Sequence, residues 1–297
     1  MDPPGIPSFT NTWHNKPYAA IYPKRPEVSA KGKTVIITGA GGGIGRATAY
    51  AFEIAGAAKI VLIGRTESTL RETQSAIVCP SEVFVADVTD EKAIAAAAAA
   101  TGQWDVLVLA AGYLAKPGTI ANSPMEEWWK SFETNVKGSV ICTQAFLKTV
   151  NPEHATIIAL SAAVDFPASR LTGLSAYISS KLSLIKVMEF LAAEHPKVSA
   201  IALHPGMIDT SILRATGIDP VEHKLPLDAV ELPAQFMVWL ASPEAAFLNG
   251  RCVWANWDVD ELKEREEEIV FGISLTPTIN GWPFPKGCGD KRRGEPV

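Results

Sequence analysis

Several common sequence signals are missing from this chain of 297 residues. Its four cysteines form no C-x-x-C pair, so the sequence predicts neither a zinc site nor a disulfide framework, and reduced thiols are typical of a cytoplasmic protein. These cysteines are Cys79, Cys142, Cys252 and Cys288. No apolar stretch has the length of a membrane-spanning helix, and no basic start with an apolar core indicates secretion. We therefore expect a cytoplasmic protein that does not bind membranes.

Long basic runs are also missing. The net charge is −5 and the isoelectric point is about 5.6, so the chain is a poor candidate for binding the phosphates of a nucleic acid. None of the five histidines belongs to a ligand-like cluster, so no metal site is predicted. Hydrophobic residues make up 47% of the chain, which is enough for a sizeable core. A small molecule is the expected partner.

The pattern along the chain divides it into three parts. Residues 1–31 are rich in Pro, Asn, Ser and aromatics without periodicity, which predicts an extended N-terminal arm over the domain or a partner subunit. Residues 32–257 form the predicted dinucleotide-binding domain, and no second domain is visible. Residues 258–297 form a C-terminal part, in which 258–268 is a charged helix with a solvated face and the rest is a tail rich in Pro and Gly.

Apolar strand-like runs alternate with helical patterns from residue 33 onward. Strands are predicted at 34–38, 59–63, 82–86, 105–109, 155–160, 198–203 and 251–254. Helices are predicted at 44–55, 68–75, 90–100, 124–148, 175–193 and 228–241. The strands look buried, so the alternation predicts an α/β fold: a Rossmann-like, doubly wound parallel sheet of about seven strands in a single domain.

A glycine-rich segment, T-G-A-G-G-G-I-G, separates the first predicted strand from the first helix. Glycine permits a tight turn at Gly39, Gly43 and Gly45, with Ile44 among them, and lets the backbone approach a pyrophosphate at the helix N-terminus. The strand before it and the helix after it are the context that such a motif needs. The segment therefore predicts a nucleotide site.

The second predicted strand ends in I-G-R-T and carries no acidic residue. An acidic side chain at this position usually binds the ribose hydroxyl of NAD. Arg65 can instead meet a 2′-phosphate with charge-assisted hydrogen bonds. The sequence therefore favours NADP(H) over NAD(H).

Tyr177 and Lys181 lie four residues apart, on one face of a predicted helix. A ketone that accepts hydride on carbon must also receive a proton on oxygen, from a donor whose pKa is near the working pH. Tyrosine titrates near pH ~10, and both a lysine ammonium and an oxidised nicotinamide favour phenolate, which lowers that pKa. Tyr177 is therefore the predicted acid in reduction and the base in oxidation.

With these features in order, residues 32–255 resemble the short-chain dehydrogenase/reductase family. The resemblance rests on motifs in register: 38–45, Asp87-Val88, 109–112, 135–138, Ser161, Tyr177 with Lys181, 204–206 and Thr210. The segment W-A-N-W-D at 254–258 is similar to fungal members.

The resemblance implies roles for five residues of the cofactor site. Asp87 would contact the adenine amino group and Val88 would lie beside the ring. Gly112 would keep the floor of the groove thin. The backbone near Ile208 and the hydroxyl of Thr210 would hold the nicotinamide half of the cofactor.

Further implications concern the long helix. Asn135 would hold a water that links Lys181 to solvent as a proton relay. The family dimerises through this helix, so Trp128-Trp129 would pack in a subunit interface rather than line a pocket, and a homodimer or homotetramer is expected.

The chain departs from the family pattern at the serine. Ser161 can donate a hydrogen bond to the substrate oxygen. In the family this serine is often the second of two, and here Ala162 follows, while the gap to Tyr177 is slightly long. Either the loop 163–174 carries an insertion and Ser161 acts, or the hydroxyl is lost at Ala162. Asp165 and Ser169 are the substitutes in the second case.

Residues 207–230 mix apolar and polar side chains and predict a lid over an apolar substrate. The predicted function is an NADP(H)-dependent oxidoreductase that interconverts a carbonyl and an alcohol, with secondary metabolism as its setting. One alternative is a non-redox cyclase or isomerase that retains the cofactor. Another is a nucleotide-sensing protein without turnover.

Overall fold

Seven parallel strands form one sheet in the computed structural model, which describes residues 8–217, 222 and 226–278. Their order is β3-β2-β1-β4-β5-β6-β7, so the predicted doubly wound sheet is confirmed. The strands are β1 (Thr34–Thr38), β2 (Lys59–Gly64), β3 (Ser81–Val85), β4 (Val106–Leu109), β5 (Ala155–Leu160), β6 (Val198–His204) and β7 (Cys252–Trp254). The strand order reverses between β1 and β4, because β2 and β3 lie on one side of β1 and the later strands lie on the other. Folds of this kind bind ligands at such a point.

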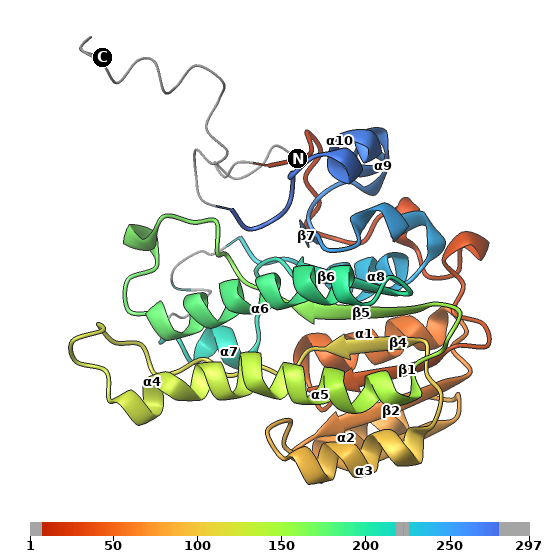
Figure 1. Ribbon diagram of the computed structural model, residues 1–297, viewed down its shortest axis with the longest axis horizontal. Coiled ribbons are helices and arrows are strands. Elements are labelled where there is room, and N and C mark those ends of the chain that lie inside the picture. Colours follow the sequence, from red (N-terminus) through yellow and green to blue (C-terminus); the bar gives the residue numbers. More distant parts are fainter. Residues whose placement is uncertain (1–7, 218–221, 223–225, 279–297) are drawn as a thin grey trace.

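Helices cover both faces of this sheet (Figure 1). One face packs against α1 (Gly43–Ile54), α2 (Glu67–Ser75) and α8 (Glu231–Leu240), and the other against α3 (Glu91–Thr101), α5 (Ser139–Phe146) and α6 (Ser175–Glu194). The strands are aliphatic on both sides because both faces are buried. In β1, for example, Val35 and Ile37 belong to the first core and Ile36 to the second.

The long helix predicted at 124–148 is interrupted. The chain forms α4 (Met125–Phe132), a π-helical turn (Glu133–Gly138), α5 and a short 3-10 turn (Leu147–Thr149). The turn passes very close to the loop after β3, because a Cβ on Gly138 would lie 2.6 Å from Cγ2 of Val88. The π-helical turn therefore depends on a glycine and carries the polar side chain of Asn135.

The N-terminal arm and the end of the described chain pack against each other. The arm contains two 3-10 turns (Ala19–Ile21 and Pro26–Val28), and Trp13 forms an antiparallel bridge with Trp257. Figure 1 shows this arm in red beside α9 (Val259–Glu264) and α10 (Glu266–Phe271) in blue. The helices that complete the described structure are α7 (Ser211–Arg214) and the 3-10 turns Ala168–Arg170 and Pro243–Leu248.

The charged stretch 258–268 is not simply a solvated helix, which corrects the expectation. Val259 and Leu262 of α9 and Ile269 of α10 are fully buried. The carboxylate of Glu261 accepts the backbone N–H groups of Asn11 and Thr12. Acidic side chains at this position therefore cap the backbone of the arm rather than only facing water.

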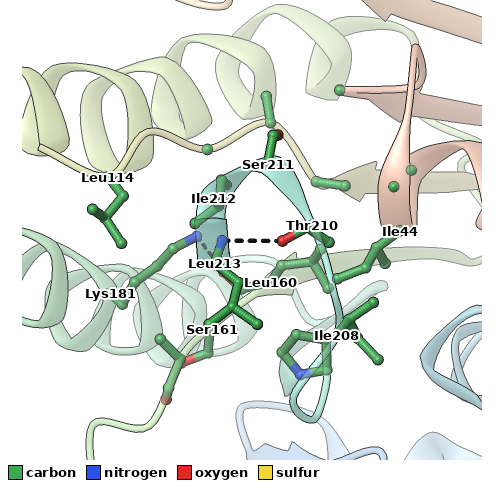
Figure 2. A pocket seen from close by; sticks show the side chains of 18 of the residues that line it. Ile44, Leu114, Leu160, Ser161, Lys181, Ile208, Thr210, Ser211, Ile212 and Leu213 are labelled. Atoms are coloured by element: carbon green, nitrogen blue, oxygen red, sulfur yellow. Dashed lines mark hydrogen bonds between the residues drawn. The ribbon is translucent and has the colours of Figure 1, made fainter. Parts of the chain in front are cut away.

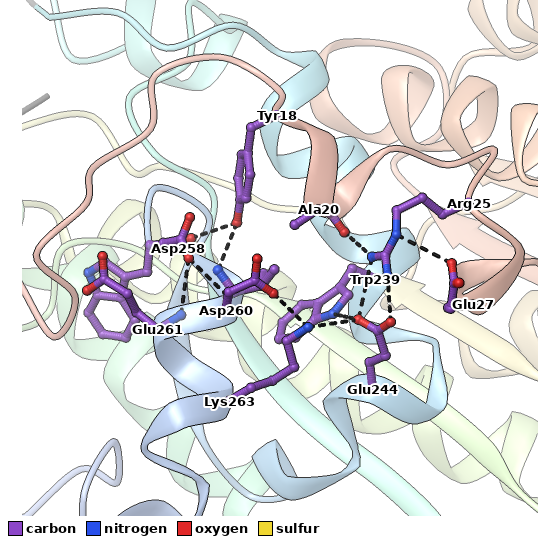
Figure 3. Close-up of polar contacts among 12 residues, drawn as sticks. Tyr18, Ala20, Arg25, Glu27, Trp239, Glu244, Asp258, Asp260, Glu261 and Lys263 are labelled. Carbon is purple, nitrogen blue, oxygen red and sulfur yellow. Dashed lines mark hydrogen bonds and ion pairs between the residues drawn. The ribbon is translucent and has the colours of Figure 1, made fainter.

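A second polar cluster holds the arm to the domain (Figure 3). Glu244 accepts a hydrogen bond from Arg25 at 2.7 Å and another from the indole of Trp239 at 3.0 Å. The hydroxyl of Tyr18 donates to the carbonyl of Trp257 and accepts from the N–H of Val259, both at 3.0 Å. Burial raises the pKa of Tyr18, so this hydroxyl stays protonated.

No helix in the described residues combines the length and the apolar character that crossing a bilayer requires.

Candidate active site

A cavity of about 590 Å³ runs along the carboxyl ends of the strands, from β2 and β3 to β7. Figure 2 shows part of its lining, around Ser161, Lys181 and Thr210. The cavity brings together all but one of the predicted site residues. Those that line it are Gly39, Gly43, Ile44, Gly45, Arg65, Asp87, Val88, Gly112, Ser161, Tyr177, Lys181, Ile208 and Thr210. Asn135 is fully buried and does not line the cavity.

Two positions of the glycine turn, Gly39 and Gly45, have no room for a side chain. Gly39 has a φ of 68°, and a Cβ on it would lie 2.9 Å from the nitrogen of Ala111. A Cβ on Gly45 would lie 2.3 Å from the carbonyl oxygen of Gly39. The N-cap of α1, Gly42, has no capping side chain, so backbone N–H groups of the first turn face the cavity unobstructed. The turn therefore fits a pyrophosphate.

The cavity end at β2 and β3 carries the side chains expected for the adenosine half. Nη1 of Arg65 lies 3.9 Å from Oδ2 of Asp87, and the Arg65 side chain is 70% exposed, so it can turn toward a phosphate. Oδ1 of Asp87 accepts the N–H and the hydroxyl of Thr89, which fixes the carboxylate as a turn residue. Thr66 and Thr69, which the sequence argument did not select, line the same end.

Tyr177 and Lys181 lie on one face of α6 and both reach the cavity. Nζ of Lys181 is 5.7 Å from the centroid of the Tyr177 ring and donates a 2.7 Å hydrogen bond to the carbonyl of Leu160 (Figure 2). Within the described residues, the phenol hydroxyl of Tyr177 has no hydrogen-bond partner. The fold thus holds the lysine by the end of β5 and leaves the phenol available to a ligand.

Burial shifts the pKa values of both groups in the protein alone. It raises the pKa of Tyr177 to about 12 and lowers the pKa of Lys181 to about 8, because each charged form loses hydration. The expected lowering of the Tyr177 pKa by Lys181 is therefore outweighed here by burial.

Asn135 makes three hydrogen bonds within the protein. Its Nδ2 donates to the carbonyl of Tyr113 and to Oγ of Ser180, both at 2.9 Å, and its Oδ1 accepts the Tyr113 N–H at 2.8 Å. These bonds tie the loop after β4 to α6, one residue before Lys181. A Cβ on Gly112 would lie 3.5 Å from Oδ1 of Asn135 and 3.7 Å from Nζ of Lys181. Gly112 thus separates the cavity from this buried network.

Ser161 follows β5 and stays in register, since its N–H donates to the carbonyl of Leu203 at 2.8 Å. Its side chain is buried, and its hydroxyl makes a 3.4 Å contact with the carbonyl of Ala162 and also interacts with the thiol of Cys252. Ser161 and Ala162 line the cavity, whereas Asp165 and Ser169 are not among the described residues that do so. Ser161 is therefore the serine best placed to meet a substrate oxygen.

Thr210 is the N-cap of α7, and its Oγ1 accepts the N–H of Leu213 at 3.3 Å (Figure 2). Ile208 is buried beside it. Both belong to the predicted lid at 207–230, of which residues 218–221 and 223–225 lie outside the described structure. Several described residues of this predicted lid, among them Met207 and Ile212, line the same cavity as Tyr177 and Lys181.

The model of the family "short chain dehydrogenase" matches residues 33–220. The chain belongs to this family. It is 36% identical over 286 residues to the short chain dehydrogenase mpl6 of Monascus purpureus, which spans 91% of this chain and 97% of the relative. It is 35% identical to a short chain dehydrogenase/reductase of Claviceps purpurea, over 89% of this chain and 91% of the relative. The predicted resemblance to fungal members is confirmed.

Solved structures agree with this dehydrogenase fold. A short-chain dehydrogenase/reductase from Brucella melitensis superposes with a TM-score of 0.67 at 26% identity, over 77% of this chain and 97% of that one. One from Serratia marcescens gives a TM-score of 0.68 at 21% identity, over 76% and 96%. As a member of this family, the protein is an NAD(P)-dependent oxidoreductase.

The dehydrogenase cavity also includes residues that the sequence argument missed. Trp13 and Asn15 of the arm line it, as do Trp254 at the end of β7 and Asn256 just after that strand. All four lie outside the family match at 33–220. The sequence marks the segment 254–258 only as similar to fungal members, and nothing in the unpatterned arm indicates that it reaches the site.

Trp128 and Trp129 do not line the dehydrogenase cavity. The indole of Trp128 donates to Oγ of Ser175 at 3.0 Å, which ties α4 to the start of α6, whereas Trp129 is 49% exposed. In the described residues no group of three His, Cys, Asp or Glu side chains could hold a metal ion. Cys79, Cys142 and Cys252 are free thiols, and Cys288 lies outside the description.

Proposed function

We propose that this dehydrogenase uses NADP(H) to interconvert a carbonyl and an alcohol on a small, largely apolar substrate. The observation that carries the proposal is that one cavity contains the glycine turn, Arg65, Tyr177 and Lys181. Nucleotide-binding and proton-transfer groups therefore face the same space.

The chain's own residues account for cofactor binding in this proposal. The open N–H groups of the turn at Gly39–Gly45 would hold the pyrophosphate, and Arg65 with the nearby threonines would hold the 2′-phosphate. Asp87 and Val88 would contact the adenine. Ile208 and Thr210 would hold the nicotinamide half, and NADP(H) when bound supplies or accepts the hydride.

Proton transfer is assigned to Tyr177. Its hydroxyl donates a proton to the carbonyl oxygen in reduction and withdraws it from the alcohol in oxidation. The ammonium of Lys181 favours the phenolate and can bind ribose hydroxyls. Ser161 donates a hydrogen bond to the substrate oxygen, which positions it and stabilises developing negative charge.

Asn135 supports the lysine. Its bond to Ser180 fixes α6 beside Lys181, so Asn135 acts as a positioning residue. The expected relay water would use the remaining acceptor capacity of this buried amide or its backbone.

The enzyme is further proposed to be a cytoplasmic homodimer or homotetramer. The support is the family's habit of assembling through the long helix, together with the 49% exposed Trp129 and the 71% exposed Met125 on α4. The Ser161-Ala162 departure and Asp165 motivate the cyclase or isomerase alternative, and Asp165 does not line the described cavity. The oxidoreductase is therefore the better-supported function.

Replacement of Tyr177 by phenylalanine tests the function. Purified protein is mixed with NADPH and a panel of ketones and aldehydes, and the absorbance of the reduced nicotinamide is followed. We expect consumption by the wild type and a loss of about a hundredfold or more in Tyr177→Phe, with NADPH binding retained. Tyr113→Phe is the matched control, since that phenol bonds Glu127 outside the cavity.

Tight NADPH binding without turnover on any carbonyl would favour the cyclase or the sensor instead. Full activity of Tyr177→Phe would contradict the assigned proton donor.

A further inference from the structure

The far end of the cavity is built from aromatic rings centred on Trp254. The His204 ring stacks on it with centroids 3.6 Å apart and planes 11° from parallel. Trp13 lies at 5.7 Å and Phe166 at 6.0 Å from the same indole. These four residues line the cavity and are called here the aromatic wall. Its faces can accept another flat ring at van der Waals distance.

The aromatic wall is far from the adenosine end. It lies at the ends of β6 and β7, and five strand spacings separate β7 from β2, where Arg65 lies. At about 4.8 Å per spacing this is roughly 24 Å. A dinucleotide held by the glycine turn at β1 and by Arg65 leaves this end of the cavity to the substrate.

Two polar atoms beside the wall lack partners. Nδ1 of His204 accepts the N–H of Gly206 at 3.0 Å, so the proton of the neutral ring is on Nε2. Burial lowers the pKa of His204 to about 3, which keeps the ring neutral. In the described part of the chain Nε2 has no hydrogen-bond partner. The wall therefore contains an unused N–H donor.

The second atom is an acceptor. Asn256 is fully buried, and its Nδ2 donates to the carbonyl of His14 at 2.8 Å, whereas its Oδ1 has no partner among the described residues. A Cβ on Gly206 would lie 3.1 Å from that Oδ1, and the Gly206 N–H bonds Nδ1 of His204, so the Asn256 side chain and the His204 ring both border this glycine. An unpaired buried acceptor is unfavourable, and a ligand that donates a hydrogen bond to it would relieve this.

We infer that the substrate carries a flat aromatic ring with a hydroxyl group. The ring stacks on the aromatic wall, and the hydroxyl accepts from Nε2 of His204 and donates to Oδ1 of Asn256. The inference rests on the proposed function only in that the cofactor occupies the other end of the cavity.

The N-terminal arm completes this subsite. The N–H of His14 donates to the carbonyl of Asn256 at 2.8 Å, next to Trp13. Nδ2 of Asn15 donates to Oδ1 of Asp228 at 2.6 Å, and Oδ2 of Asp228 accepts the N–H of Met207 at 2.7 Å. The hydrogen bonds of His14 and Asn15, the two residues that follow Trp13, thus fix its position.

Calorimetric titration of the full chain saturated with NADP⁺ tests the inference, with 2-naphthol as the probe. We expect measurable binding, weakened about tenfold or more in Trp13→Ala and largely restored in Trp13→Phe, which keeps a ring. Phe9→Leu is the matched control, because Phe9 lies in the same arm and packs on Trp257 but does not line the cavity. This variant should change the affinity less than about twofold.

A second probe separates ring stacking from hydroxyl recognition. 2-Methoxynaphthalene cannot donate to Asn256, so it should bind about tenfold more weakly than 2-naphthol. Absence of 2-naphthol binding, equal binding by Trp13→Ala, or equal affinity for the two probes would overturn the inference. Failure of the protein to bind NADP⁺ would instead count against the proposed function. In that case, titration with 2-naphthol in the absence of cofactor would still test binding to the aromatic wall.

Discussion

The two ends of the cavity are built in opposite ways. At the cofactor end the surface is mainly backbone, where glycines keep N–H groups bare. At the substrate end the surface is made of large rings, and Trp13 and Trp254 come from outside the family match at 33–220. If the further inference is correct, the cofactor turn lies in the matched segment, whereas two of the four rings of the aromatic wall come from the flanking segments and would contribute to substrate selectivity.

Gly45 offers the most severe way to disturb the cofactor end alone. A methyl group in Gly45→Ala would collide with the Gly39 carbonyl, so the turn must shift. We expect NADPH affinity to fall about a hundredfold or more, measured by calorimetry. Ile54→Ala, at the exposed end of α1 and outside the cavity, is the control. Equal losses in the two variants would mean that the tight turn is not what binds the phosphates.

Arg65 sharpens the assignment of the adenosine end. Arg65→Ala removes a charge-assisted hydrogen bond of about 1.5–3 kcal/mol to the 2′-phosphate. NADPH binding should weaken roughly tenfold to a hundredfold while NADH binding stays nearly constant. Arg71→Ala on α2, where the arginine pairs with Glu67 outside the cavity, should alter neither. A parallel loss of both cofactors would refute the preference for NADP(H).

Lys181 lies between the two ends and predicts a pH effect on stability. Its pKa is about 8 in the folded protein and 10.5 as the ordinary value, so the unfolded chain binds more protons between these values. The free energy of unfolding should therefore rise from pH 8 to pH 10, by about 2 kcal/mol more in the wild type than in Lys181→Met. Urea unfolding at both pH values measures this, and Lys186→Met on the exposed face of α6 should behave like the wild type.

The arm gives the smallest expected effect, confined to the substrate end. Nε2 of His14 lies 2.8 Å from Oδ2 of Asp258, and the His14 ring stacks on Tyr18. His14→Ala should lower the free energy of unfolding by about 1 kcal/mol, or roughly 2–4 °C in melting temperature. KM for the carbonyl substrate should rise while NADPH affinity holds. A change in NADPH affinity without a change in KM would contradict the assignment of the arm to the substrate end of the cavity.

Sequence reasoning predicted the features that depend on a local pattern of residues. The buried strands, the bare glycines and the i, i+4 pair of Tyr177 and Lys181 are each visible within a short window, and the structure places the pair and the glycines in one cavity. The fold and the family were therefore predictable. The assigned roles of Ser161 and Arg65 stay predictions for the experiments above.

The missed features depend on contacts between distant segments. Trp13 carries no periodic signal, and its partner Trp257 is far away in sequence. The charged α9 looks solvated because most of its residues are acidic or basic, while only Val259 and Leu262 reveal the buried side. The π-helical turn at 133–138 was not predicted either, and its Gly138 packs closely on Val88, which is distant in sequence.

The contact between His14 and Asp258 joins residues that are separated by most of the chain. This separation affects the order in which the parts of the protein fold. Closing so large a loop costs entropy before any contact compensates, so we expect the arm to dock after the sheet has formed. A nascent molecule would then be competent for its nucleotide before it can discriminate among substrates. Pulse-labelling hydrogen exchange should show the amides of β1 protected earlier than those of His14 and Asn256.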